Sequence, residues 1–305
     1  MKHRPFKQVD VFSALPYLGN PLAVVLDGSD LDADAMQGFA RWTHLSETTF
    51  LLPPTQAGAD YRVRIFTPEG ELPFAGHPTL GSCHAWLQAG GSPASQDFIV
   101  QECGIGLVRI RREGHRLAFG APPLKRSDPS PVLLAQVAAA LGLKPTQIIA
   151  AQLLDNGPVW LGLLLDDPQT VLGIAPDHAS LKKWGQKVGV AAMSSISGMP
   201  TLIGRSNREA RAFGGHDQAP PMQASDLEVR AFAAPIGIDE DPVTGSLNAG
   251  LAQWLIAEGH APSSYIAGQG QCLGRAGRVH VTQDERRQVW IGGESVTCID
   301  GKVLL

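Results

Sequence analysis

Two helical stretches with almost no polar face limit most strongly how this chain folds. Residues 76–90 read GHPTLGSCHAWLQAG, and residues 245–259 read GSLNAGLAQWLIAEG. Each begins with glycine, carries a second glycine five residues later and ends before another glycine. A helix that is apolar all round must be surrounded by protein on every side. The sequence therefore predicts two buried helices, each wrapped by its own sheet.

Strand-like segments surround the two helices in matching order. VRIF at 63–66 is answered by VRAF at 229–232, and similar glycine-containing segments follow both helices. Chance echoes occur in any chain with helices and strands, but ordered matches favour an internal duplication. We expect an α+β fold of two homologous lobes, each a mostly antiparallel, curled, barrel-like sheet around its central helix. The active site is expected in a cleft between the lobes.

The length of 305 residues suits two lobes of ordinary domain size. Pro, Ser and charged residues cluster at 120–131, which indicates the boundary between the lobes. We predict an N-terminal lobe of residues 1–121, joined by a last strand at 294–305, and a C-terminal lobe of residues 122–293. Residues 206–224 are predicted to form a long polar loop.

Charge and hydropathy exclude several classes of partner. The net charge is −4 and the estimated pI about 6.1, so the chain has no basic field for nucleic acid. No window reaches the roughly 18 apolar residues of a membrane helix, and we expect a cytoplasmic protein without membrane contact. The spacings of Cys83, Cys103, Cys272 and Cys298 fit neither a zinc ribbon nor a CxxC pair. We expect reduced, mostly buried thiols.

The starts of the two buried helices suggest a binding site. A helix start leaves about four backbone N–H groups unpaired and carries roughly half a positive charge. Gly76 and Gly245 have no side chains there, so the amides of both helices are accessible to one small carboxylate. The alternative is that side chains cap the helices, with Ser246 or Thr244 serving the second one.

Three ionisable residues are candidates for proton transfer near these helix starts. His77 follows Gly76, where the helix dipole favours a neutral ring, although a capping or core histidine is the alternative. Asp241 lies in an acidic run before the second helix, where a solvated loop is the competing interpretation. Glu47 stands between a helix and an apolar strand, where burial would raise its pKa, whereas an exposed glutamate is the simpler alternative.

Five motifs, in this order, carry a resemblance to a known family: GNPLAVVLDG, HLSETTF, FTPEGELPFAGHPTLG, EDPVTGS and QGQCLGR. The chain resembles the phenazine-biosynthesis isomerases (PhzF-like proteins), part of the diaminopimelate epimerase-like fold group. The resemblance implies a two-lobed homodimer that works without a metal or an organic cofactor. It assigns acid–base chemistry to Glu47, His77 and Asp241, and substrate binding to Gly76, Thr244, Gly245 and Ser246.

We therefore expect a cofactor-independent isomerase that moves a proton within a small carboxylic acid, as dihydro-hydroxyanthranilate isomerase does. The alternatives are an amino-acid epimerase or racemase, and a non-catalytic dimer that binds small acids. Related racemases use cysteines at the helix starts, and here no cysteine lies at either start. The well-studied phenazine-pathway member has Asn where this chain has His44, so we do not assign the phenazine precursor as substrate.

Overall fold

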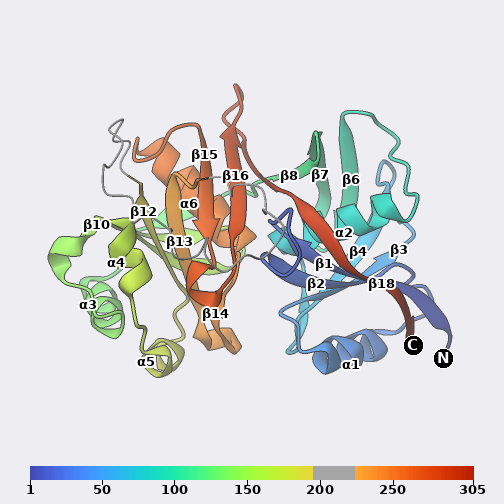
Figure 1. Ribbon diagram of the computed structural model, residues 1–305, viewed down its shortest axis with the longest axis horizontal. Coiled ribbons are helices and arrows are strands. Elements are labelled where there is room, and N and C mark those ends of the chain that lie inside the picture. Colours follow the sequence, from blue (N-terminus) through green and yellow to red (C-terminus); the bar gives the residue numbers. More distant parts are fainter. Residues whose placement is uncertain (195–223) are drawn as a thin grey trace, which may run out of the picture.

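The computed structural model describes residues 1–194 and 224–305, which form two lobes lying side by side (Figure 1). Most of the regular structure is strand, and both chain ends lie in the same lobe. The predicted α+β class is therefore confirmed. The polar loop predicted at 206–224 lies outside the described residues except for Ala224.

The N-terminal lobe is a curled sheet in the order β18-β1-β2-β3-β4-β6-β7-β8, with the short β5 beside β4. Its elements are β1 (His3–Val11), β2 (Asn20–Val25), α1 (Ala33–Thr43), β3 (Thr48–Leu52), β4 (Tyr61–Phe66), β5 (Glu71–Leu72), α2 (Gly76–Gln88), β6 (Phe98–Cys103), β7 (Gly106–Glu113), β8 (Arg116–Gly120) and β18 (Ser295–Leu304).

The C-terminal lobe has the order β9-β10-β11-β12-β13-β15-β16-β17, with β14 beside β13. Its strands are β9 (Lys125–Ser127), β10 (Ile148–Asp155), β11 (Val159–Leu165), β12 (Val188–Met193), β13 (Leu227–Ala233), β14 (Ile238–Asp241), β15 (Ser264–Gln269), β16 (Gly277–Gln283) and β17 (Val289–Gly293). Its α-helices are α3 (Pro131–Ala140), α4 (Pro168–Gly173), α5 (His178–Lys183) and α6 (Gly245–Ala257), and short 3₁₀ turns lie at Pro145–Gln147, Ala234–Ile236 and Gln271–Leu273.

The two lobes repeat the same series of strand pairings. From β18 to β8 the neighbours pair antiparallel, antiparallel, parallel, antiparallel, parallel, antiparallel and antiparallel. From β9 to β17 the series is identical. VRIF lies in β4 and VRAF in β13, which take the same place in the two series. The duplication predicted from short sequence matches therefore extends to the whole topology.

The chain crosses between the lobes twice. It leaves the N-terminal lobe between β8 and β9, and it returns between β17 and β18. Strand β18 then pairs with β1 along its whole length, from His3 opposite Leu304 to Val11 opposite Ser295. The predicted limits at 121/122 and 293/294 fall in these two crossings, and as domain boundaries they stay a prediction. The lobes are joined where β8 pairs antiparallel with β17.

Helices α2 and α6 fill the centres of the two lobes, as predicted. Most residues of each helix are buried. A Cβ built on Gly81 would lie 2.6 Å from Leu22, and one built on Gly250 would lie 3.3 Å from Leu154. The second glycine of each helix therefore lets the surrounding sheet approach the helix closely. Fully buried side chains such as Leu80 each contribute about 1.5–3 kcal/mol of hydrophobic stabilisation.

The expectation about the cysteines needs correction. Only Cys83 and Cys103 are buried, whereas Cys272 is exposed in a 3₁₀ turn and Cys298 is partly exposed, so the thiols are not mostly buried. Trp42 is 75% exposed although α1 buries Met36, Phe39 and Ala40 on its inner side. Among the described residues, no helix has the length and apolar character that crossing a bilayer requires.

The same two-pronged ion pair holds the strand before each buried helix. Arg64 on β4 donates to both carboxylate oxygens of Glu71 on β5, at 2.7 Å each. Arg230 on β13 donates to both oxygens of Glu240 on β14, at 2.9 and 2.8 Å. Each glutamate stands five residues before the glycine that starts its helix. The duplicated pair therefore fixes the segment that leads into each helix start.

The two ion pairs differ in burial. The side chains of Arg230 and Glu240 are 5% and 8% exposed, against 21% and 42% for Arg64 and Glu71. Arg230 also donates to the carbonyl oxygens of Val171 and Ile174 at the end of α4. The C-terminal pair is therefore the one whose loss leaves a charge in the interior.

We predict that Arg230→Met destabilises the protein by about 3–5 kcal/mol, because the Glu240 carboxylate stays buried without its partner. The matched change Arg64→Met is expected to cost about 0–1 kcal/mol, since water solvates Glu71. Urea unfolding at pH 7 measures both values. Equal losses would show that burial does not set the strength of this contact.

Candidate active site

The starts of α2 and α6 touch at the boundary between the lobes. A Cβ built on Gly76 would lie 3.0 Å from the Cα of Gly245, and one built on Gly245 would lie 3.2 Å from the backbone N of His77. Both positions therefore need glycine, because any side chain would push the two helices apart. The structure thus brings together the two helix starts that the sequence singled out.

Neither helix start is capped by a side chain. Thr244, the N-cap residue of α6, donates its hydroxyl to Asp241 Oδ2 at 2.5 Å instead. The Ser246 hydroxyl accepts a hydrogen bond from Trp160 Nε1 at 3.2 Å. The capping alternative is therefore wrong for both residues. The first-turn amides of both helices direct their partial positive charges toward one place.

Glu47 and His77 face each other beside the helix starts. Glu47 lies in the turn between α1 and β3, and the buried strand that follows draws its side chain inward, to 15% exposure. Its Oε2 is 3.5 Å from Nε2 of His77, which is 6% exposed. Both atoms are buried and neither has a hydrogen-bond partner among the described residues. Unpaired buried polar atoms are rare, and two that face each other indicate a place for a ligand.

Burial shifts the pKa of each residue of this pair in the direction that favours its neutral form. Burial raises the pKa of Glu47 to about 7, and a hydrogen bond from Ser46 opposes this only in part. Burial lowers the pKa of His77 to about 4, although the charge of Asp241 acts in the opposite direction. At pH 7 the imidazole is therefore neutral, and its contact with Glu47 is not an ion pair.

The hydrogen bonds of His77 define which nitrogen carries its proton. The backbone carbonyl of Pro21 accepts a hydrogen bond from the ring, and Nε2 is the nitrogen without a partner. The neutral ring therefore carries its proton on Nδ1 and turns the lone pair of Nε2 toward Glu47. His77 is thus arranged to accept a proton or a hydrogen bond at Nε2.

Asp241 reaches the site from the C-terminal lobe, at the end of β14. Its Oδ1 accepts a hydrogen bond from Asn20 at 2.9 Å, and its Oδ2 accepts the one from Thr244. Burial, together with the nearby Glu47 carboxylate, raises the pKa of Asp241 to about 6. A solvated acidic loop does not fit this environment. Between about pH 6 and 7, the two carboxyl groups therefore share roughly one proton.

Two supporting residues were not singled out from the sequence. Asn20, fully buried at the start of β2, donates to Asp241 and to the carbonyl oxygen of Val243 across the boundary between the lobes. Gln269 on β15 accepts from the amide of Thr244 and donates to the carbonyl oxygen of Asp241. Asn20 lies in the GNPLAVVLDG motif and Gln269 in the QGQCLGR motif. An amide side chain within an apolar strand was the sequence feature that could have identified them.

The His, Cys, Asp and Glu side chains of the described residues do not gather as a metal site would require. Within residues 1–194 and 224–305, no group of three or more His, Cys, Asp or Glu side chains is arranged to hold a metal ion.

His44 is exposed at the C-terminal end of α1 with φ 55°. Asn is favoured in this left-handed conformation, so the difference from the phenazine-pathway member concerns a helix end.

Comparison with known proteins places these features in context. Residues 9–301 match the family model described as "Phenazine biosynthesis-like protein". The chain is 35% identical to "Antisense-enhancing sequence 1" of Schizosaccharomyces pombe, with 99% of each chain covered. It is 29% identical to the trans-2,3-dihydro-3-hydroxyanthranilate isomerase of Pseudomonas chlororaphis, covering 97% of this chain and 98% of that protein. The crystal structure of a PhzF family protein from Enterococcus faecalis has a TM-score of 0.76 at 26% identity, with both chains fully covered.

The raised pKa of Glu47 has a consequence for stability. Between about pH 4.5 and 7 the folded chain holds a proton that the unfolded chain has lost, so this residue lowers stability as the pH rises through that window. Glu47→Gln mimics the protonated form and removes the effect. As the pH rises from 5 to 8, we expect the free energy of unfolding of the variant to increase by about 2–3 kcal/mol relative to that of wild type. Urea unfolding at several pH values measures this difference. A constant difference across this range would mean that Glu47 titrates normally.

Proposed function

Since this chain belongs to the phenazine biosynthesis-like protein family and is an isomerase, we propose that it moves a proton within a small unsaturated carboxylic acid. The observation that carries the proposal is the buried pair of Glu47 and His77, whose facing atoms lack partners beside two uncapped helix starts. The proposal therefore assigns anion binding and proton transfer to the same site. The relative named trans-2,3-dihydro-3-hydroxyanthranilate isomerase supports a substrate of this class.

The substrate carboxylate is assigned to the helix starts. The amides of Gly76, Gly245 and Ser246 carry the partial positive charge that an anion needs, and the contact between the two glycines brings the two helix starts close together. The Ser246 hydroxyl accepts from Trp160, so its own proton stays available for the ligand. Thr244 is committed to Asp241 and Gln269, and its proposed role is to position the aspartate.

Glu47 is assigned as the base. Its ionised carboxylate removes a proton from carbon, and the C–H electron pair moves into the conjugated system of the substrate. The protonated Glu47 then returns the proton at another carbon, so the enzyme ends in its starting state. A pKa of about 7 suits both halves of this cycle, because the group is neither a weak base nor a weak acid at neutral pH.

His77 and Asp241 are assigned to hold the polar groups of the substrate. Neutral His77 accepts a hydrogen bond at Nε2, while Asp241 is held by Asn20 and Thr244 in a fixed orientation. Groups fixed before the substrate arrives stabilise developing charge without reorganising during the reaction. The same positions serve an epimerase, in which the proton returns to the carbon that it left.

The proposal is tested by proton exchange in deuterated water. We expect at least one acid from a panel of cyclic and acyclic unsaturated carboxylic acids to incorporate deuterium, as followed by NMR. Glu47→Gln is expected to slow this exchange by about 10²–10⁴-fold, because the base is lost. Exchange in the wild type should rise with pH to a plateau above about pH 7, as the base ionises.

The matched control is Glu285→Gln, a change of the same kind at an exposed position. It should exchange as fast as wild type. Equal rates for Glu47→Gln and wild type would remove Glu47 as the base. Loss of optical rotation without migration of the double bond would instead favour the epimerase.

A further inference from the structure

The duplicated sheets contain a counterpart of Glu47 in the C-terminal lobe. In the N-terminal lobe the last residue of VRIF pairs with Thr48, which begins β3. In the C-terminal lobe the last residue of VRAF pairs with Val188, which begins β12. The residues just before these two strands are Glu47 and Lys187. Lys187 therefore takes the position of the candidate base in the other lobe, with the opposite charge.

Lys187 packs against the ring of Trp160. Its side chain is partly buried, and its Nζ lies over the Trp160 ring, 5.2 Å from the ring centroid. Within the part of the chain that the structure describes, its ammonium forms no ion pair, and burial lowers its pKa. Taking a cation out of water is unfavourable without a partner, whereas the face of an indole ring attracts a cation. Trp160 is therefore the group that holds the charge of Lys187.

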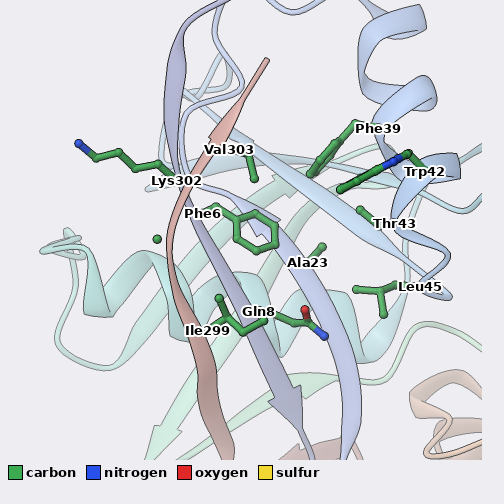
Figure 2. Close-up of a pocket in the computed structure, with 11 residues that line it drawn as sticks. Phe6, Gln8, Ala23, Phe39, Trp42, Thr43, Leu45, Ile299, Lys302 and Val303 are labelled. Atoms are coloured by element: carbon green, nitrogen blue, oxygen red, sulfur yellow. The ribbon is translucent and has the colours of Figure 1, made fainter.

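Lys302 shows how a lysine behaves when water is within reach. It borders an apolar groove of about 430 Å³ between α1 and the strands β1 and β18, and Trp42 lines the same groove. Figure 2 shows the side chain of Lys302 extending away from the groove and from Trp42, and the residue is exposed. Nearby aromatic surface does not by itself draw a lysine inward. The burial of Lys187 thus needs another reason, and the hydrogen bond of Trp160 supplies one.

Trp160 connects Lys187 to the start of α6. Trp160 Nε1 donates to the Ser246 hydroxyl at 3.2 Å, and Asn156 Nδ2 donates to the carbonyl oxygen of Ser246 at 2.8 Å. Both donors lie at the hairpin between β10 and β11, so one hairpin holds Ser246 at its backbone and at its side chain. A cation over an indole ring draws electron density from it, which strengthens the N–H as a donor, and linked hydrogen bonds polarise one another.

The charge balance of the site gives this connection a purpose. Near pH 7, Glu47 and Asp241 together keep roughly one negative charge, and His77 is neutral. The carboxylate of a substrate adds a second negative charge, and each helix start offers only about half a positive charge. Lys187 adds positive charge on the side of α6, opposite in sign to the group that the N-terminal lobe carries at the same position.

We propose that Lys187 and Trp160 are positioning residues for the substrate carboxylate: the Lys187 ammonium polarises the Trp160 indole, which holds the Ser246 hydroxyl with its proton turned toward the carboxylate. The inference rests on the proposed function, because that function assigns the carboxylate to the start of α6. Neither residue touches the substrate in this arrangement. The two equivalent positions of the duplicated sheets then serve proton transfer in one lobe and anion binding in the other.

The connection is tested in the free protein by NMR. The Trp160 indole N–H gives one of six tryptophan N–H resonances, identified as the one that Trp160→Phe removes. We expect Lys187→Met to move this resonance upfield, because the hydrogen bond to Ser246 weakens, and Lys187→Arg to restore its position. Lys183→Met removes an exposed lysine of α5 and should leave the resonance unchanged. An unchanged resonance in Lys187→Met would overturn the proposal.

The role in anion binding is tested with benzoate, a stable aromatic carboxylate, by isothermal titration calorimetry. Lys187→Met should weaken benzoate binding about three- to tenfold, because the Ser246 hydroxyl loses part of its polarisation. In a Ser246→Ala background the same change should have no effect, since both changes act at one hydroxyl. Lys187→Arg should bind as wild type does. No binding by wild type, equal affinity of Lys187→Met, or an undiminished effect in the Ser246→Ala background would contradict the proposal.

Glu47→Gln separates this inference from the proposed function. The variant loses the base and a negative charge but keeps the Ser246 hydroxyl, so it should bind benzoate at least as tightly as wild type. If no acid exchanges deuterium while benzoate binding still depends on Lys187, the proton-transfer assignment fails and the anion assignment stands.

With an acid that does exchange, Lys187→Met should raise KM and leave kcat nearly unchanged, because the carboxylate is held equally before and during proton transfer. A fall in kcat at constant KM would place Lys187 in the chemical step and end its assignment as a positioning residue.

Discussion

Two buried helices that start at the same point without side-chain caps are the constraint on which this protein depends. Each start carries roughly half a positive charge and unpaired amides, so leaving it buried is unfavourable unless an anion is near. The protein places ionisable groups there instead of capping side chains. Gly76 and Gly245 let the starts come into contact, and Glu47 and Asp241 bring carboxyl groups to the same place. The chemistry of the site follows from a feature of the backbone.

The scaffold is duplicated but the site is not. When the glycines that start the two helices are superposed in sequence, Asp241 corresponds to Leu72, and His77 corresponds to Ser246. The N-terminal lobe therefore supplies the imidazole and the C-terminal lobe the aspartate. A symmetric pair of helix starts would bind an anion without preference for one orientation, whereas in the proposed function these differences give the substrate a defined direction. Reaction at one carbon and not at its mirror position requires such an asymmetry.

Much of the fold could be predicted because the duplication is visible in the sequence as repeated segments. These are the two apolar helices and the matching VRIF and VRAF strands. The burial of α2 and α6 followed from their lack of a polar face. The side-chain hydrogen bonds between the lobes could not be predicted, since they join residues far apart in the chain. Asn20 reaches Asp241 across 221 positions, and neither residue signals the other in the sequence. Thr244 was expected to cap a helix or bind substrate, and only the structure shows that Asp241 takes its hydroxyl.

The order of the three pKa values bears on how the proposed site would bind an acid. His77 has a pKa of about 4 and is therefore neutral at pH 7, so it contributes no positive charge there. Glu47 and Asp241 titrate at about 7 and 6, and together they keep roughly one negative charge at neutral pH. A substrate carboxylate adds a second negative charge, which raises both pKa values and favours protonation of one carboxyl group. The helix amides offset the remaining charge. In the proposed function, binding of an acid and uptake of a proton are therefore coupled, and the ionised base is recovered only as the substrate carboxylate moves onto the amides and away from Glu47.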